Sequence, residues 1–321
     1  MVFHQVVCHD AEELSQSLRH TNVSAMQINK GGFAGELSVY ELNGWHLQHL
    51  SFNEGRATCR GDSPRHHHAV VVPVQLSERY SLLGREIGAS SIGLYAPGSE
   101  HLDTTSAGAT QVVVIPSASF VEAAAAERKN RLSTSGSHHV SVGLPELDQL
   151  RHTLAQIHTA LSEARITDPT GACARCLADE LHTALWGTLS SRQQPSKMGR
   201  PELPRATILH KLKDWLEQNP EEPIFVSEIC SDLGLSFPTL RRIFIECYGV
   251  PPARYMLMRR YHIARRMLRS GKYASIADVA QRCGFWDASR FSSGYQGLFG
   301  ELPSVTAKNA TTPRRLPGRR R

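Results

Sequence analysis

Long hydrophobic runs are absent from this 321-residue chain. No stretch approaches the ~20 consecutive apolar residues that a membrane-spanning helix needs. The first twenty residues contain Asp10, Glu12 and Glu13 and lack the apolar segment of a secretory leader. We therefore expect a cytoplasmic protein with no membrane partner.

Cysteine pairs are scarce, although the chain has seven cysteines. Cys173 and Cys176 form one C-x-x-C motif, but a zinc site needs a second pair at a suitable spacing and none follows. Cys230, Cys247 and Cys283 fall in or near helical patterns and are typical of small apolar residues in a reducing compartment. The sequence thus predicts neither a metal nor a cofactor.

Histidine is unevenly distributed, with fourteen of the sixteen residues in positions 1–199. His66 and His68 have the spacing of the first two ligands of a cupin metal centre, but no glutamate follows closely. The favoured interpretation is a polar loop before a strand at 69–74, since histidine is common at protein surfaces. A cupin-type metalloenzyme is the alternative, and metal analysis would decide between them.

Charge separates the chain into two parts. Residues 1–199 carry 15 Lys/Arg against 19 Asp/Glu, a balance of −4, whereas residues 200–321 carry 21 against 11, a balance of +10. A strongly basic part is typical of a domain that meets a polyanion. The arginine-rich tail at 308–321 is too polar to fold and is expected to add salt-sensitive affinity for that polyanion.

Two copies of one pattern lie about fifty residues apart within 223–305. The first-copy residues Ile229, Cys230, Gly234 and Leu235 recur as Val279, Ala280, Gly284 and Phe285. After the turn, Leu240, Phe244, Gly249 and Pro252 recur as Phe291, Tyr295, Gly300 and Pro303, with one residue inserted. Each copy predicts a short helix, a glycine turn and a second helix, which is the helix-turn-helix layout. We place these motifs at 226–247 and 276–299.

The second helix of the first copy predicts a DNA-reading surface. Its core face is Leu240, Ile243 and Phe244, and Ser236 precedes it as an N-cap. The residues expected to meet double-stranded DNA are Ser236, Pro238, Thr239, Arg241, Arg242 and Ile245. Arginine on such a face pairs bidentately with guanine in the major groove. The alternative is a solvated basic face on an ordinary helical bundle, which the matched repeat disfavours.

The second copy presents shorter side chains. Asp287 is its predicted N-cap, and the residues expected at DNA are Ser289, Arg290, Ser292, Ser293 and Gln296. Serine makes short, permissive contacts, so we expect this copy to position the protein while the first discriminates bases. A helix from Pro252 to about Arg269, closed by Gly271, should join the copies so that they face successive major-groove segments roughly 34 Å apart.

The repeat resembles the DNA-binding domain of the AraC/XylS family of bacterial transcriptional regulators. The resemblance rests on the second copy with its exit, Ala280 to Phe285, Phe291, Tyr295, Phe299-Gly300 and Pro303-Ser304. Within that family, the runs at 284–286 and 298–304 are most similar to ethanolamine-utilisation regulators. The resemblance implies a cupin-like effector domain, activation beside RNA polymerase, a homodimer, and ethanolamine or a similar small amine as effector.

The N-terminal half predicts β structure after a helix at 10–19. Alternating runs at 36–42 and 45–52 flank Asn43-Gly44, which is typical of a hairpin turn, and further strands are expected at 69–74, 91–95 and 111–115. Several short strands indicate an antiparallel sandwich or barrel, which can hold a small ligand. Trp45, Tyr95 and His101 are candidate lining residues for an effector pocket, with ordinary packing as the alternative.

Helices are expected at 118–131, 145–165 and 172–189, with a loop at 133–139. The long pair suits either packing on the β domain or dimerisation. The fold class is therefore α+β, with a β-rich domain at 1–131, a helical connector at 132–192, a linker at 193–204, an all-α DNA-binding domain at 205–307 and the tail at 308–321.

These patterns predict an effector-responsive transcriptional regulator that binds promoter DNA in the nucleoid and is not an enzyme. An alkyl-transfer repair enzyme would need a cysteine-rich zinc module or a Pro-Cys-His run, and the chain has neither. A DNA-tethered cupin metalloenzyme and a nucleoid-associated protein are two competing hypotheses. Footprinting distinguishes the nucleoid-associated protein, since such a protein protects no discrete site.

Overall fold

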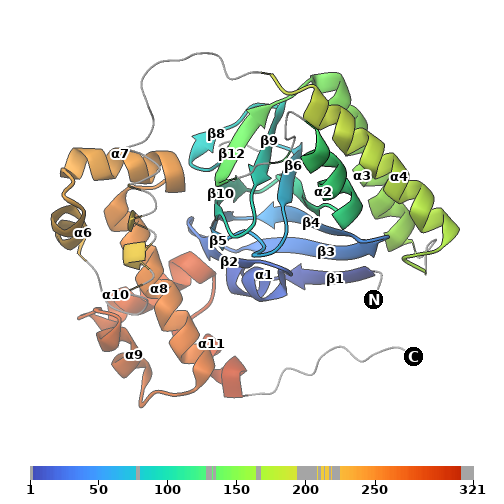
Figure 1. The fold of residues 1–321 in the computed structure, drawn as a ribbon. Helices are drawn as coiled ribbons and strands as arrows, with labels where there is room; N and C mark the ends of the chain where they lie inside the picture. The colour runs from blue at the N-terminus through green and yellow to red at the C-terminus, as the bar shows by residue number, and fades with distance from the viewer. Residues whose placement is uncertain are drawn as a thin grey trace. The chain divides into compact units, whose positions relative to one another are not determined.

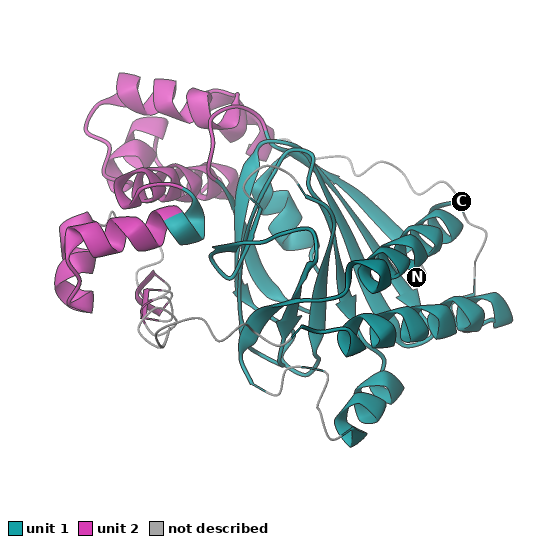
Figure 2. Cartoon of the chain, turned by 90° about the horizontal axis from the view of Figure 1, so that it is seen from above, with its two compact units in different colours: residues 1–27, 33–200, 246–249 teal, residues 28–32, 201–245, 250–321 magenta. Residues whose placement is uncertain are grey.

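The computed structural model describes residues 3–76, 80–127, 132, 135–163, 168–193 and 225–311, together with single positions between 208 and 218. The predicted linker beyond 193 and the tail from 312 onward lie outside these residues. The chain divides into two compact units (Figure 2). Unit 1 comprises Met1–Gln27, Phe33–Arg200 and Glu246–Gly249, and unit 2 comprises Ile28–Gly32, Pro201–Ile245 and Val250–Arg321.

Unit 1 contains two antiparallel sheets (Figure 1). The seven-stranded sheet has the order β1 (Phe3–Cys8), β3 (Ala34–Leu42), β4 (Trp45–Glu54), β11 (Thr110–Ile115), β6 (Ala69–Gln75), β9 (Ser91–Tyr95) and β12 (Ser137–Ser141). The five-stranded sheet has the order β2 (Asn22–Gln27), β5 (Arg56–Asp62), β10 (Glu100–Ser106), β7 (Ser81–Leu82) and β8 (Arg85–Glu86). Every strand predicted from the sequence is present.

The seven-stranded sheet is buried on both faces, and its sequence explains why. In β4, Trp45 and Leu47 pack into one hydrophobic core, while Leu50 and Phe52 pack into another. Successive side chains of a strand point to opposite faces, so a strand covered on both sides needs apolar residues at both parities. One core joins this sheet to helices, and the other holds residues from both sheets.

Helices cover the outer face of the larger sheet (Figure 1). They are α2 (Ala118–Ala126), α3 (Leu144–Ser162) and α4 (Ala172–Ser190), and α1 (Ala11–Ser17) packs on the other core. The α3 stripe of Leu147, Leu150, Leu154, Ile157 and Leu161 lies buried against the sheet. Of the two roles considered for this stripe, packing on the β domain is therefore confirmed.

Two local predictions had opposite outcomes. The hairpin turn between β3 and β4 is confirmed, with φ of 44° at Asn43 and 82° at Gly44, as a turn with two left-handed residues requires. The loop predicted at 133–139 is wrong from Ser137 onward, because β12 pairs with β9 through His139 and Gly93. The prediction failed because Ser137-His138-His139 offers no apolar alternation.

Apart from the segment Ile28–Gly32, the described part of unit 2 is helical. Its helices are α6 (Val226–Leu233), α7 (Phe237–Tyr248), α8 (Pro252–Ser270), α9 (Ile276–Arg282), α10 (Ala288–Phe299) and α11 (Pro303–Thr311). The last residues of α7 belong to unit 1. The last helix was not predicted and continues past position 307, where the sequence had placed the domain end. The described positions between 208 and 218 are helical, with Leu212 and Leu216 buried. No described helix is both long and apolar enough to cross a bilayer.

Candidate nucleic-acid interface

The first helix-turn-helix motif is formed by α6, a glycine turn and α7. Gly234 ends α6 in the left-handed conformation, with φ of 63°, and the Leu235 N–H donates to the Cys230 carbonyl at 2.9 Å. Ser236 then caps α7, because its Oγ accepts from the Thr239 N–H at 3.4 Å. This sequence of contacts closes one helix and starts the next within three residues.

The outward face of α7 matches the prediction. Leu240, Ile243 and Phe244 are buried. The exposed predicted residues are Ser236, Pro238, Arg241, Arg242 and Ile245, and Thr239 is half-buried. Within the described residues, neither arginine has a hydrogen-bond or ion-pair partner, so both guanidinium groups are available to a ligand. Planar guanidinium groups suit guanine edges and phosphate oxygens.

The second motif, α9 and α10, has a stronger cap. The Asp287 carboxylate accepts from the backbone N–H groups of Arg290 at 3.0 Å and Ser289 at 2.9 Å, and these bonds lower the pKa of Asp287. The predicted residues on the α10 face are exposed Ser289, Arg290, Ser293 and Gln296 and half-buried Ser292. The face therefore presents hydroxyl and amide groups, with Arg290 as a flanking cation.

Trp286 is the residue inserted in the second copy, and the predicted interface omits it. In the chain it stands between Phe285, whose ring stacks on Tyr261, and the N-cap Asp287, and it is 90% exposed. An aromatic residue this exposed contributes little to packing. Exposed aromatic side chains are favoured at binding surfaces, where they give contact area at a low entropic cost. The feature of the sequence that could have identified Trp286 is that it is the extra residue of the second copy.

Helix α8 anchors the second motif through its arginines and aromatics. Arg260 donates Nε–H to the Cys283 carbonyl at 2.7 Å and Nη2–H to the Gly284 carbonyl, and its guanidinium stacks 4.2 Å over Phe285. These carbonyls end α9 and would otherwise have no intrahelical partner. Tyr261 stacks on the Phe285 ring, with the centroids 4.6 Å apart.

A buried polar chain holds the far end of α10. Arg265 bonds Glu301 at 3.0 Å, and the same Glu301 oxygen accepts from Thr306 at 2.7 Å. Thr306 in turn lies 2.8 Å from the Tyr295 hydroxyl. This chain connects α8, α10 and α11, so α11 completes the second motif.

The three candidate effector residues do not meet in unit 1. Tyr95 and His101 line one cavity between the sheets, with ring centroids 5.0 Å apart. Trp45 packs on the helix-covered face of the larger sheet, where its ring lies 5.1 Å from Phe120. The alternation of a strand shows which residues share a face, but it does not show which face packs on helices. For this reason Trp45 was placed in one predicted pocket with Tyr95 and His101, which the structure does not show.

The same cavity holds a polar cluster that the sequence did not single out. Asp103 is fully buried on β10, and its Oδ2 accepts from Gln111 Nε2 at 3.0 Å. The Tyr80 hydroxyl donates to the Gln111 side chain. Burial raises the pKa of Tyr80 and Tyr95 far above the ordinary value, with Asp103 adding to the rise. Among the described residues, no three His, Cys, Asp or Glu side chains form a metal cluster.

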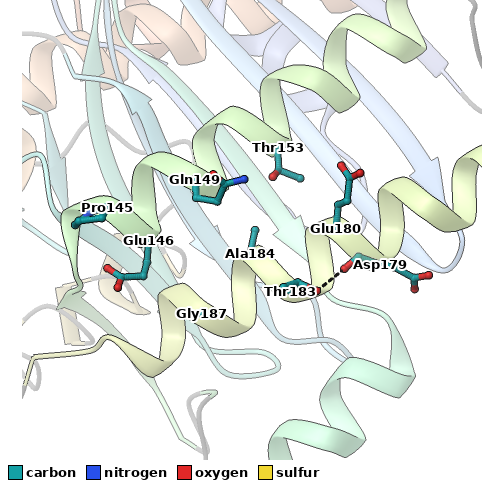
Figure 3. A pocket seen from close by; sticks show the side chains of 9 residues that line it. All are labelled: Pro145, Glu146, Gln149, Thr153, Asp179, Glu180, Thr183, Ala184 and Gly187. Carbon is teal, nitrogen blue, oxygen red and sulfur yellow. Dashed lines mark hydrogen bonds between the residues drawn. The ribbon is translucent and has the colours of Figure 1, made fainter.

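A second hollow of unit 1 runs between α3 and α4 (Figure 3). Its lining is Pro145, Glu146, Gln149, Thr153, Asp179, Glu180, Thr183, Ala184 and Gly187. Three carboxylates give this open groove an acidic character. The groove is open because the α4 residues Ala184 and Gly187 have no long side chain to fill it.

Comparisons with known proteins agree with the geometry of unit 2. A family model described as a helix-turn-helix domain matches residues 229–309. The HTH-type transcriptional activator RhaS of Klebsiella pneumoniae (strain 342) is 30% identical over 165 residues, which are 51% of this chain and 55% of that protein. The "Probable thc operon regulatory protein" of Rhodococcus erythropolis is 29% identical over 133 residues, 41% of this chain and 39% of that protein.

The chain thus spans about half or less of the length of these relatives. Among solved structures, the AraC-like transcriptional activator CuxR covers 87% of this chain and 100% of its own, at 15% identity and a TM-score of 0.43.

Two capped helix-turn-helix motifs joined by one long helix make unit 2 a helix-turn-helix DNA-binding domain. In this domain the chain is similar to helix-turn-helix transcriptional activators, in agreement with the resemblance to the AraC/XylS family. The resemblance given by the repeat is therefore confirmed.

Proposed function

We propose that the chain is a sequence-specific transcriptional activator that binds promoter DNA through unit 2 and responds to a small molecule bound in unit 1. The observation that carries the DNA-binding part is the exposed face of α7, where Arg241 and Arg242 stand without partners among the described residues. Similarity to RhaS, an HTH-type transcriptional activator, supports activation over repression.

The two motifs divide the work. The arginines of α7 discriminate bases, because a guanidinium reaches two acceptors of guanine in the major groove. The serines of α10 and the flanking Arg290 contact phosphates and fix the register of the protein on the duplex. Trp286 adds apolar contact at the edge of the second motif, where it is exposed.

The response to a small molecule is assigned to the cavity between the two sheets. It is lined by fifteen residues that include Tyr95, His101 and Asp103. RNA polymerase is the proposed partner at the promoter, and the protein acts in the cytoplasm without catalytic activity. Homodimerisation is assigned to the outer face of α3 and α4, and sedimentation velocity at low and high salt tests it, because the acidic groove residues repel their own copies less when screened.

Footprinting with the full chain tests the DNA-binding proposal. Promoter fragments from the neighbourhood of the encoding gene are probed against random competitor DNA, with Arg241→Ala as the matched variant. The expected result is a discrete protected site of two adjacent segments that the variant weakens. Uniform protection without a discrete site would instead support a nucleoid-associated protein, and in vitro transcription with RNA polymerase separates activator from repressor.

A further inference from the structure

The proposed DNA-binding function makes no use of the C-x-x-C motif at Cys173 and Cys176. The motif lies at the start of α4, and neither cysteine forms a disulfide in the structure. Of the chain's seven cysteines, these are the two that are exposed. Cysteine is among the residue types most often buried, and its conservation of place on a surface is decided by reactivity and not by packing. Two exposed thiols one helical turn apart therefore indicate a chemical role.

The buried cysteines of unit 1 show the contrast. Cys8 and Cys59 are 0% and 3% exposed and belong to the core that holds residues from both sheets. Burial raises the pKa of the Cys8 thiol to about 12 and the pKa of the Cys59 thiol well above its ordinary value. The thiolate is the reactive form, so these two thiols are inert. Reagents in solution reach Cys173 and Cys176 instead.

Helix α4 places both reactive thiols on one side. Ala174, between them, is 0% exposed and packs in the core under α4, so residues 173 and 176 share the opposite, outer side of the helix. In a regular helix, Cα atoms three residues apart are separated by about 5 Å, which lies within the roughly 4.4–6.8 Å of disulfides. Their Cβ atoms are about 5–6 Å apart, whereas a disulfide needs about 3.5–4.5 Å. The thiols can be joined if this turn of the helix tightens.

The start of α4 is a place where tightening disrupts few hydrogen bonds. The N-cap Gly171 makes no side-chain cap bond, and the first backbone bond of the helix runs from the Arg175 N–H to the Gly171 carbonyl at 3.0 Å. The N–H groups before Arg175 have no intrahelical acceptor to lose. A disulfide closed here would be exposed and slightly strained, and disulfides of that kind are the readily reduced, regulatory ones.

We propose that Cys173 and Cys176 form a redox-sensitive dithiol, which a low-molecular-weight disulfide such as oxidised glutathione converts reversibly to an intramolecular disulfide. One thiolate attacks a sulfur of the small disulfide, whose S–S bond breaks, and a mixed disulfide and one free glutathione result. The second thiolate attacks the cysteine sulfur of the mixed disulfide and releases the second glutathione. The dithiol loses two electrons, the small disulfide gains them, and the two thiol protons pass to the released glutathione molecules.

This modification goes beyond the proposed function and does not depend on it. In a reducing compartment, disulfides are transient and serve redox sensing or catalysis. Closure tightens the first turn of α4, whose preceding residue Pro169 accepts a hydrogen bond from the Asn43 N–H at 2.8 Å. The dithiol thus lies next to the β3–β4 hairpin.

Incubation of the full chain with oxidised glutathione tests the proposal. Remaining thiols are blocked with iodoacetamide, and cleavage after glutamate gives one peptide, residues 164–180, that contains both cysteines. We expect this peptide to lose two hydrogens and to take up no iodoacetamide, and dithiothreitol should reverse the change. Unmodified thiols, two glutathione adducts, or a disulfide between two chains on a non-reducing gel would each overturn the proposal.

Single variants test the exchange mechanism. Cys173→Ser and Cys176→Ser should each stop at the mixed disulfide, with one glutathione on the remaining cysteine. Cys230→Ser, at a half-buried position of unit 2, is the matched control and should oxidise like the original protein. Both variants replace exposed side chains and should unfold at the same denaturant concentration as the original. Absence of the glutathione adduct from both variants overturns the mechanism.

Phenylarsine oxide separates the proximity of the thiols from their closure. Its arsenic atom binds two thiolates at once and bridges them without bringing the Cβ atoms as close as a disulfide does. The original protein should bind one equivalent, roughly a hundredfold more tightly than either single variant, because the second thiolate binds intramolecularly. Bound arsenical should also block oxidation by glutathione disulfide. Capture of the arsenical by a pair that glutathione disulfide does not close overturns the proposal, since α4 then holds the thiols apart.

Discussion

The two helix-turn-helix motifs of unit 2 share a backbone plan but differ in what they expose and in how they are held. The first shows Arg241 and Arg242 to solvent, whereas the second shows Ser292 and Ser293 at the matching positions. An arginine side chain is long, positively charged and has several directed hydrogen-bond donors, whereas a serine side chain is short and uncharged. The exposed chemistry therefore supports our proposal that the first motif reads bases.

Packing differs in the opposite direction. The second motif is fixed by the Arg260 bonds to the end of α9, by the Tyr261–Phe285 stack and by the polar chain from Arg265 to Tyr295. In the first motif, Phe225 and Phe237 are more than half exposed, at 64% and 53%. The first motif is held by the Phe244–Tyr255 ring contact, with centroids 5.3 Å apart, and by the Trp215–Asp232 hydrogen bond at 2.8 Å, so the contacts described for the second motif are the more numerous. Under our proposal, the second motif holds the duplex and the first motif reads its bases.

The largest effect is expected at the anchoring of the second motif. A Cβ at Gly294 would collide with the Tyr261 hydroxyl and ring, so Gly294→Val should destabilise unit 2 by ~2–3 kcal/mol through overpacking. Gly297→Ala on the same helix is the matched control, because its Cβ meets nothing within 4 Å, and it should stabilise the helix by up to ~1 kcal/mol. Denaturant unfolding of the full chain, followed by circular dichroism, measures both.

Equal stability of the Gly294→Val variant and the original protein would mean that α8 and α10 are not in close contact, and the contrast in anchoring would fail.

The next effect concerns base reading by the first motif. Arg241→Ala should cost ~1–3 kcal/mol at the preferred site and relax the preference at one base position. Arg290→Ala is the matched control in the second motif, and it should weaken all DNA sequences alike by about 0.5 kcal/mol, since Arg290 is an exposed flanking cation. Fluorescence anisotropy with single-base variants of the site measures the two profiles.

A uniform loss for Arg241→Ala would make Arg241 a phosphate contact, and a position-specific loss for Arg290→Ala would exchange the proposed roles of the two motifs.

The organisation of unit 2 could be predicted from the sequence because the repeat supplied two independent copies of each constraint. Glycines at 234 and 284 mark left-handed turns, and the caps Ser236 and Asp287 start each recognition helix, as observed. Trp286 was missed because hydrophobicity predicts burial for an aromatic side chain, and only the fold shows that an inserted residue points outward.

Unit 1 was predicted less completely, for a physical reason. Strands rich in apolar residues, such as Ala69–Gln75, are recognisable from the sequence, whereas β10 is mostly polar, with Leu102 as its one apolar residue, and was not predicted. His101 and Asp103 of this strand face the cavity between the sheets, so β10 lacks the alternation of apolar and polar residues that reveals a strand. The effector residues could not be selected for the same reason, since pairing of Asp103 with Gln111 joins strands that belong to different sheets.

A smaller loss of DNA affinity is expected when Trp286 is replaced, and it tests whether the second motif contacts DNA without reading its sequence. Trp286→Ala should weaken DNA binding by ~1 kcal/mol for every sequence, because an exposed aromatic contributes contact area without directed hydrogen bonds. It should leave the unfolding free energy within about 0.5 kcal/mol, since the side chain is 90% exposed. Trp286→Phe is the control and should retain most of the affinity. Unchanged binding in Trp286→Ala would remove this residue from the interface.

The smallest effect is expected for the serines that replace the arginines. Ser293→Ala should change binding by less than about 0.5 kcal/mol, and by the same amount at every base variant, because a short hydroxyl that contacts phosphate carries no sequence information. Anisotropy titrations with the single-base series used for Arg241→Ala make the two positions directly comparable. A loss at one base position as large as that of Arg241→Ala would mean that both motifs read bases, and the denser anchoring of the second motif would then serve to aim a reader instead of only holding the duplex.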